Sequence, residues 1–159
     1  MPPPYRRILI ICHANTSRSA IAEALLKKML RERALHEQVI VESGGVAPFA
    51  RDGALVSLDA RMVLRDEGIH LPPDSVATDL KTNRHLVREA DLILAMTDQQ
   101  IEILRAVFPE ADGKPVYTLK AFAGHPGNIE DPAGRDEAFF ANCRDEIKDC
   151  LERAMPRLI

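Results

Sequence analysis

The feature that most constrains the fold is a run of four bulky aliphatic residues, Ile8 to Ile11, which ends at a cysteine. A continuous apolar run of this length is typical of a strand buried on both faces, as in a parallel sheet. From Ser19 onward, apolar residues recur at three- and four-residue steps: Ile21, Ala22, Leu25, Leu26, Met29 and Leu30. This spacing predicts an amphipathic helix. The chain therefore begins with a strand and a helix in direct succession, the unit from which parallel α/β sheets are built.

Further apolar runs predict strands at residues 39–41, 92–96 and 116–119. Helical patterns fill the intervals, at about 55–67, 81–89, 98–107 and 136–154. Because strands that alternate with helices connect by right-handed crossovers, we predict an α/β fold, an open doubly wound sheet of four parallel strands with helices on both faces. Turns are expected at Gly44-Gly45, Pro72-Pro73 and Pro126-Gly127. Nothing in the sequence is typical of a linker, so residues 1–159 are expected to form a single domain.

The bulk composition limits the classes of function. The chain of 159 residues is 46% hydrophobic and 28% charged, which is ordinary for a globular domain. Its net charge of −3 supplies no basic surface, so no nucleic-acid partner is expected. The run at 8–11 is too short for a signal or membrane segment, so we expect a cytoplasmic protein with no membrane partner. The three cysteines, an odd number, favour free thiols over a disulfide framework.

The junction of the first strand and helix combines residues that suit phosphate chemistry. Five residues separate Cys12 from Arg18, and the hydroxyl residue Ser19 follows. A loop between a strand's carboxyl end and a helix N-terminus directs several backbone N–H groups to one place, where the helix dipole favours an anion. Arg18 would add a guanidinium fork that forms two hydrogen bonds with phosphate oxygens. The pattern predicts a phosphate-binding loop made of His13, Ala14, Asn15, Thr16, Ser17 and Arg18.

Cys12 would lie beneath a phosphate bound in this loop. The loop amides and Arg18 favour the thiolate, the nucleophilic form, whose attack on phosphorus would give a cysteinyl-phosphate. Ser19 is placed to donate a hydrogen bond to the sulfur, and Asn15 could brace the loop through its side chain. A cysteine and an arginine separated by five residues also arise by chance. Its position at the carboxyl end of a buried strand is what gives the spacing weight.

A second element, Glu130-Asp131-Pro132, follows the last predicted strand and so belongs to the same carboxyl edge of the sheet. The carboxylic acid of Asp131 could protonate the leaving oxygen or nitrogen. As a carboxylate it could then activate the water that hydrolyses the phosphocysteine. Alone, an Asp-Pro pair is more often a turn or a helix start. Its combination with Cys12 and Arg18 is what predicts a catalytic acid.

Together these residues resemble the low-molecular-weight protein-tyrosine phosphatase family, whose loop has the form C-x-G-N-x-C-R-S and whose acid lies in a late Asp-Pro pair. The similarity covers nearly the whole chain. Further segments look like bacterial members, including the protein-arginine phosphatases: Ser43-Gly44-Gly45-Val46, residues 90–97 and Tyr117-Thr118-Leu119-Lys120. The resemblance implies a phosphotyrosine phosphatase I-like fold.

For the site, the resemblance implies Cys12 as nucleophile, Arg18 as ligand of the phosphate and of the transition state, and Asp131 as general acid and base. It implies supporting roles for Asn15 and Ser19, and a phosphorylated protein or peptide as partner. No cofactor and no metal are implied, and the five histidines show no metal-ligand spacing. The sequence does not fix the oligomeric state, for which a monomer is favoured.

Three positions depart from the family pattern. Ala14 stands where the family has glycine, which would strain the loop if that position needs a positive φ. Ser17 stands where many members carry a second cysteine, so a protective disulfide with Cys12 cannot form. Ala133 follows the Asp-Pro pair, where members often place an aromatic residue that walls the substrate slot, so a wide mouth is expected.

The phosphorylated side chain has two candidates. Thr16 occupies a variable loop position that is threonine in the arginine phosphatases, although threonine also occurs in bacterial phosphotyrosine members. We expect phosphotyrosine as substrate, with phosphoarginine as the alternative and a non-catalytic phosphate-binding module, suggested by Ala14, as a third. An arsenate reductase would need two further redox cysteines near Cys12. Cys143 and Cys150 are instead predicted on the last helix, too far apart for a disulfide.

Overall fold

The alternating side chains of β1 (Arg7–Cys12) divide the hydrophobic core into two layers. Ile8 and Ile10 point to one face of the sheet, and Leu9 and Ile11 point to the other. Successive residues of a strand face opposite sides, so an unbroken apolar run suits a strand that is covered on both faces. The structure, a computed structural model, describes residues 2–159.

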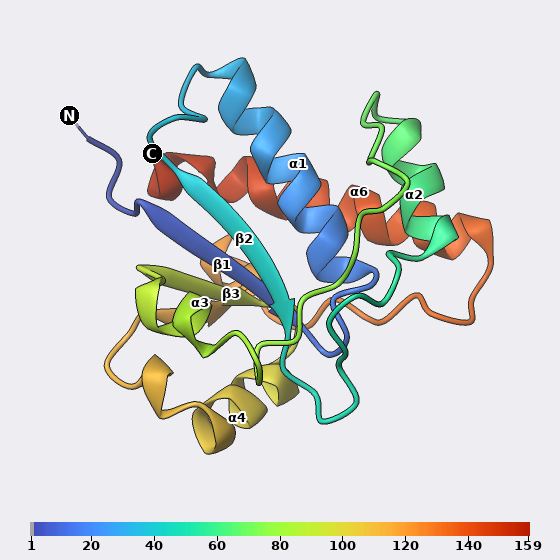
Figure 1. The fold of residues 1–159 in the computed structure, drawn as a ribbon. Coiled ribbons are helices and arrows are strands. Elements are labelled where there is room, and N and C mark those ends of the chain that lie inside the picture. The colour runs from blue at the N-terminus through green and yellow to red at the C-terminus, as the bar shows by residue number, and fades with distance from the viewer. Residues whose placement is uncertain (1) are drawn as a thin grey trace.

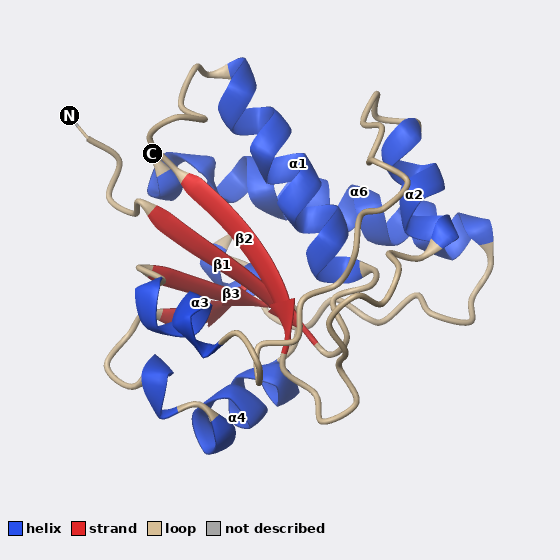
Figure 2. Cartoon of the chain, in the orientation of Figure 1, coloured by secondary structure: helices blue, strands red, loops and turns tan. Residues whose placement is uncertain are grey.

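The sheet contains four parallel strands in the order β2-β1-β3-β4. The remaining strands are β2 (Ile40–Gly45), β3 (Leu92–Ala95) and β4 (Val116–Thr118). This arrangement confirms the predicted doubly wound α/β sheet. The strand order reverses beside β1, and open α/β sheets bind ligands at the carboxyl ends of the strands next to such a reversal. Figure 2 shows the loops after β1 and β2 gathered at this edge.

Helices cover both faces of the sheet (Figure 1). One face carries α1 (Arg18–Glu32), α2 (Leu58–Arg65) and α6 (Glu137–Leu158). The other carries α3 (Arg84–Glu89), α4 (Asp98–Val107) and the 3-10 turn η1 (Pro109–Ala111). The short helix α5 (Leu119–Phe122) follows β4 directly. Within residues 2–159, no helix is both long and apolar enough to cross a membrane.

Near the carboxyl edge of the sheet, two local predictions are wrong, and the helix predicted at 81–89 begins only at Arg84. Gly44-Gly45, predicted as a turn, form the end of β2, where glycine permits close packing. A Cβ atom at Gly45 would lie 2.6 Å from the carbonyl oxygen of His13. The second error is the strand predicted to reach residue 119, because α5 begins there instead. The hydroxyl of Thr118 accepts a hydrogen bond from the backbone N of Ala121 and caps the new helix.

Candidate active site

The loop between β1 and α1 surrounds the sulfur of Cys12. This residue is 4% exposed, and its Sγ lies 2.9 Å from Ser19 Oγ. The backbone N of Asn15 donates a hydrogen bond to the same sulfur over 3.2 Å. Both groups can donate hydrogen to the sulfur, as a thiolate nucleophile requires. The structure therefore brings together three residues that the sequence predicted for the site.

The N-terminus of α1 is open toward this loop. Ser17 is the N-cap residue, but its side chain forms no capping hydrogen bond. Its Oγ instead lies 3.2 Å from Ser57 Oγ. The first amides of α1 are thus left without a side-chain cap, and the positive end of the helix dipole favours an anion at this place.

Asn15 adopts the one left-handed backbone conformation in the loop, with φ of 65°. Asparagine tolerates this conformation better than most residues. Its Oδ1 accepts a hydrogen bond from Thr78 N over 2.8 Å, and its Nδ2 donates to Ser19 Oγ over 2.7 Å and to Ser43 Oγ over 2.9 Å. Because the positive φ lies at Asn15, the backbone strain considered for Ala14 does not arise.

Arg18 joins the phosphate loop to the segment that bears the predicted acid. Its side chain is 3% exposed, and Nη1 donates to the carbonyl oxygen of Ile129 over 2.8 Å. Its Nη2 lies 3.7 Å from Asp131 Oδ2. The other oxygen of Asp131 accepts a hydrogen bond from Ala133 N over 3.0 Å. Asp131 is half exposed, so its carboxyl group is at once fixed in position and open to substrate and water.

Phe49 lies beside His13, the first residue of the predicted phosphate-binding loop. Their ring centroids are 6.4 Å apart with the planes tilted by 39°, and Phe49 is 68% exposed. Burial lowers the pKa of His13 below 6.5, the Arg18 charge lowers it further, and Asp131 opposes both. The neutral form of the imidazole is therefore favoured. Ala14 and Thr16 are also half-buried.

Sequence reasoning missed two residues of this region. Ser43 lies within β2 and accepts a hydrogen bond from Asn15, which follows the paired strand β1. Phe49 is an exposed aromatic residue in the loop after β2. The available signal was composition, because only 4% of the chain is aromatic and an aromatic side chain in a loop after a strand therefore stands out.

The other two cysteines are buried in the core on α6 and are free, as is Cys12. Burial raises the pKa of Cys143 to about 12 and the pKa of Cys150 to about 11. Both thiols therefore stay protonated at neutral pH. Within residues 2–159, no three His, Cys, Asp or Glu side chains cluster in a way that could hold a metal ion.

The fold and the site define a class, the α/β phosphatases with a cysteine on a phosphate-binding loop. Residues 7–158 match the family model for low molecular weight phosphotyrosine protein phosphatase, and the chain belongs to this family. It is 35% identical to a protein-arginine-phosphatase of Geobacillus stearothermophilus, over 98% of this chain and 97% of the relative. It is 31% identical to the low molecular weight protein-tyrosine-phosphatase Ptp of Acinetobacter johnsonii, over 92% and 94% of the two chains.

Solved structures give the same assignment. The YwlE arginine phosphatase from Geobacillus stearothermophilus aligns with a TM-score of 0.82 and 36% identity, covering 98% of this chain and 93% of the other. A low molecular weight protein tyrosine phosphatase from T. tengcongensis aligns with a TM-score of 0.83 and 31% identity, covering 96% and 99%. This chain is therefore a cysteine-dependent protein phosphatase, as its sequence predicted.

Proposed function

We propose that this chain hydrolyses phosphotyrosine in proteins through a cysteinyl-phosphate, with Cys12 as nucleophile, Arg18 as phosphate ligand and Asp131 as general acid and base. The observation that carries the proposal is the convergence of these groups. Cys12 Sγ lies 2.9 Å from the hydroxyl of Ser19 on the loop that Arg18 closes, and Arg18 Nη2 lies 3.7 Å from Asp131. Nucleophile, anion ligand and acid thus belong to one edge of the sheet.

The reaction has two chemical steps. In the first, the Cys12 thiolate attacks phosphorus, the bond from phosphorus to the tyrosine oxygen breaks, and Asp131 donates its proton to that oxygen. In the second, the Asp131 carboxylate accepts a proton from water as the water attacks the phosphocysteine, which releases phosphate and restores the thiolate. The loop amides and the guanidinium of Arg18 stabilise the charge on the phosphoryl oxygens in both steps. Ser19 stabilises the sulfur as it leaves.

A relative supports the covalent step. A cysteine-to-serine variant of the YwlE arginine phosphatase has a phosphorylated active-site serine, and it aligns with this chain with a TM-score of 0.85 and 32% identity, over 96% of this chain and 95% of the other. Phosphate on the residue that replaces the cysteine is what nucleophilic catalysis at this position produces.

Phosphotyrosine suits the mouth of the site because Phe49 offers an exposed aromatic face beside His13. A specific observation favours phosphoarginine as a second candidate. Thr16 places a small polar side chain in the loop, and relatives named protein-arginine-phosphatase are 35% and 33% identical to this chain. The mechanism would be the same, with Asp131 protonating a guanidinium nitrogen. Ala133 places no aromatic wall on the side of Asp131.

We place the enzyme in the cytoplasm, with a phosphorylated protein or peptide as its substrate. The free thiols of Cys12, Cys143 and Cys150 support a reducing compartment. Every residue in the proposed mechanism comes from one chain, which supports a monomer as the functional unit.

The first test is turnover of p-nitrophenyl phosphate, a phosphotyrosine peptide and a phosphoarginine peptide by wild type and Cys12→Ser, in chelator. We expect metal-free turnover by wild type, loss of all turnover in the variant, and the higher kcat/KM on the phosphotyrosine peptide. A fully active Cys12→Ser protein would falsify the mechanism. Wild-type inactivity on all three substrates would favour a non-catalytic phosphate-binding module, and preference for the other peptide would select phosphoarginine.

Asp131→Ala tests the general acid separately. On the phosphotyrosine peptide, whose leaving group needs a proton, kcat should fall by about 10²- to 10⁴-fold. On p-nitrophenyl phosphate the first step should fall much less, because nitrophenolate leaves without a proton. Single-turnover release of the phenol from both substrates makes the comparison. Equal losses on the two substrates would remove Asp131 from the role of acid.

A further inference from the structure

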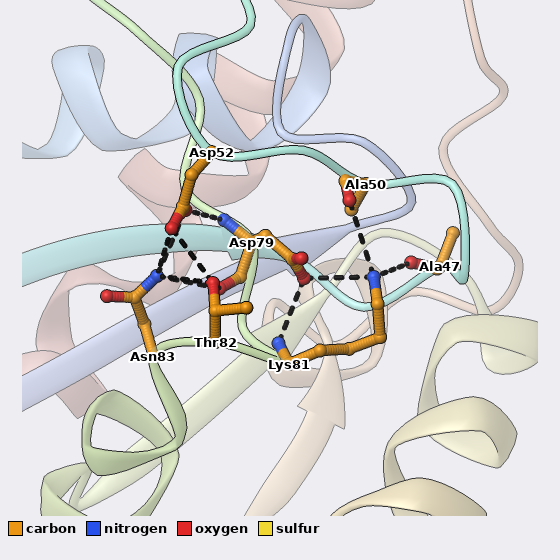
Figure 3. Close-up of polar contacts among 7 residues, drawn as sticks. All are labelled: Ala47, Ala50, Asp52, Asp79, Lys81, Thr82 and Asn83. Carbon is orange, nitrogen blue, oxygen red and sulfur yellow. Dashed lines mark hydrogen bonds and ion pairs between the residues drawn. The ribbon is translucent and has the colours of Figure 1, made fainter.

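Lys81, which lies outside the phosphate loop, connects two segments that contact this loop. Lys81 Nζ donates hydrogen bonds to the carbonyl oxygens of Ala47 over 2.7 Å and of Ala50 over 3.4 Å. It also lies 2.9 Å from Oδ1 of Asp79 (Figure 3). Asp79 is only 7% exposed, so this ion pair is largely shielded from solvent. We call residues 47–52 the mouth loop and residues 78–83 the anchor segment.

The far end of the mouth loop is held by the same anchor segment. The carboxylate of Asp52 accepts hydrogen bonds from Asp79 N over 2.6 Å, from Thr82 Oγ1 over 2.8 Å and from Asn83 Nδ2 over 3.0 Å (Figure 3). These hydrogen bonds lower the pKa of Asp52 below 3.8, and the bond from Asp79 N has the largest effect. Asp52 is therefore ionised at neutral pH. The mouth loop is thus attached by polar contacts at residues 47, 50 and 52.

The mouth loop and the phosphate loop are in direct contact. Ala47 N donates a hydrogen bond to the carbonyl oxygen of His13 over 3.0 Å. Phe49, at the exposed part of the mouth loop, faces the ring of the same histidine. The anchor segment also contacts the phosphate loop, since Thr78 N donates to Asn15 Oδ1 over 2.8 Å. One segment therefore fixes both the loop that would bind phosphate and the loop beside it.

We propose that Lys81, together with Asp79 and Asp52, positions the mouth loop so that Phe49 contacts the part of the substrate outside the phosphate loop. This inference rests on the proposed function. Lys81 has its donors engaged by two carbonyl oxygens and one carboxylate, so it is a positioning residue and not a catalytic one. Removal of the Lys81 ammonium group should weaken binding of the part of the substrate outside the phosphate loop. The rate of the chemical step should stay the same.

Lys81→Met tests this by the division between KM and kcat. For a phosphotyrosine peptide we expect KM to rise about tenfold, which corresponds to about 1.4 kcal/mol of binding free energy. The kcat value and inhibition by inorganic phosphate should stay within about twofold, because phosphate occupies only the phosphate loop. Lys81→Arg retains the charge and the donors, and should recover most of the affinity.

Lys114→Met is the matched control. Lys114 Nζ also donates to two carbonyl oxygens, those of Arg88 over 2.7 Å and Ala90 over 2.8 Å, but these lie at the opposite edge of the sheet, before β3 and β4. The Lys114→Met variant should have a lower midpoint of urea unfolding and an unchanged KM. An equal KM change in Lys81→Met and Lys114→Met would overturn the proposal.

A double-mutant cycle with Phe49→Ala identifies the route. If Lys81 acts through Phe49, the KM of Lys81→Met/Phe49→Ala should equal that of Phe49→Ala alone. If the increases in KM of the two single variants multiply in the double variant, the proposal is contradicted. If Lys81→Met does not fold, Asp52→Ala decides the same comparison, because it removes the exposed carboxylate by which the mouth loop binds the anchor segment. Failure of the proposed function has a different signature, either wild type without turnover or Cys12→Ser with it.

Discussion

At the scale of single residues, the phosphate loop needs a side chain that tolerates a left-handed backbone and also forms hydrogen bonds. Asn15 meets both needs, with φ of 65° and an amide bonded to Thr78, Ser19 and Ser43. Glycine would meet only the first need and alanine neither. The two requirements can therefore be separated by substitution.

Asn15→Gly and Asn15→Ala should both lose turnover, because each removes the amide. The alanine variant should be less stable than the glycine variant by about 1 kcal/mol, the cost of a left-handed conformation. Urea unfolding measures this difference. Ala34→Gly is the control, since Ala34 has φ of 56° beyond the end of α1 and should gain stability with unchanged turnover. Equal stability of the two Asn15 variants would mean that the loop relaxes.

The sequence alone was enough to place three candidate site residues at one edge of the sheet. Cys12 and Arg18 are separated by the length of one loop, and Asp131 follows a strand that ends at the same edge. Phe49 and Lys81 could not be found in this way. Their relation to the loop depends on hydrogen bonds between segments far apart in the sequence, which neither periodicity nor spacing records.

At the scale of elements, the predicted bounds agree with the structure for one helix. The helix predicted at 98–107 is α4, whose start is marked by a capping box between Thr97 and Gln100. The helix predicted at 136–154 continues to Leu158, past Pro156. Met155 and Leu158 are buried, so tertiary packing extends the helix where intrinsic propensity would end it. The helix predicted at 55–67 is shorter, because the cap at Ser57 starts α2 at residue 58.

The end of β2 makes an element-scale prediction. A Cβ at Gly45 would meet backbone atoms of the phosphate loop, His13 O at 2.6 Å and the Ala14 carbonyl carbon at 2.9 Å. Gly45→Ala should therefore displace the loop and lower kcat. It should also lower the free energy of unfolding by at least about 1 kcal/mol. In Gly44→Ala the new Cβ would lie 2.5 Å from the side chain of Leu80. This variant should lose stability but keep its kcat. Assays of turnover and urea unfolding on both variants make the comparison, and an active Gly45→Ala enzyme would show that the close approach is dispensable.

At the scale of the whole molecule, α6 closes the core on one face of the sheet. It packs against α1, α2 and α5, and so contacts elements from the start, the middle and the end of the chain. Cys143 and Cys150 lie on its buried side. Since both thiols are buried only in the folded state, their ionisation is coupled to unfolding of the molecule.

The free energy of unfolding should therefore fall at alkaline pH. Burial raises the pKa of Cys143 from 9.0 to about 12 and that of Cys150 from 9.0 to about 11. Above pH 9 the unfolded chain releases these protons while the folded protein retains them, so the stabilisation is complete below pH 9 and is lost as pH rises toward 11 and 12.

Cys143→Ala/Cys150→Ala should be less stable than wild type at pH 7 by about 1–3 kcal/mol, because packing is lost. That deficit should shrink between pH 9 and about 10.5, as urea unfolding in a reducing agent would measure, since only wild type has these thiols to ionise. A deficit that stays constant with pH would show that the two thiols ionise in the folded protein as readily as in the unfolded chain.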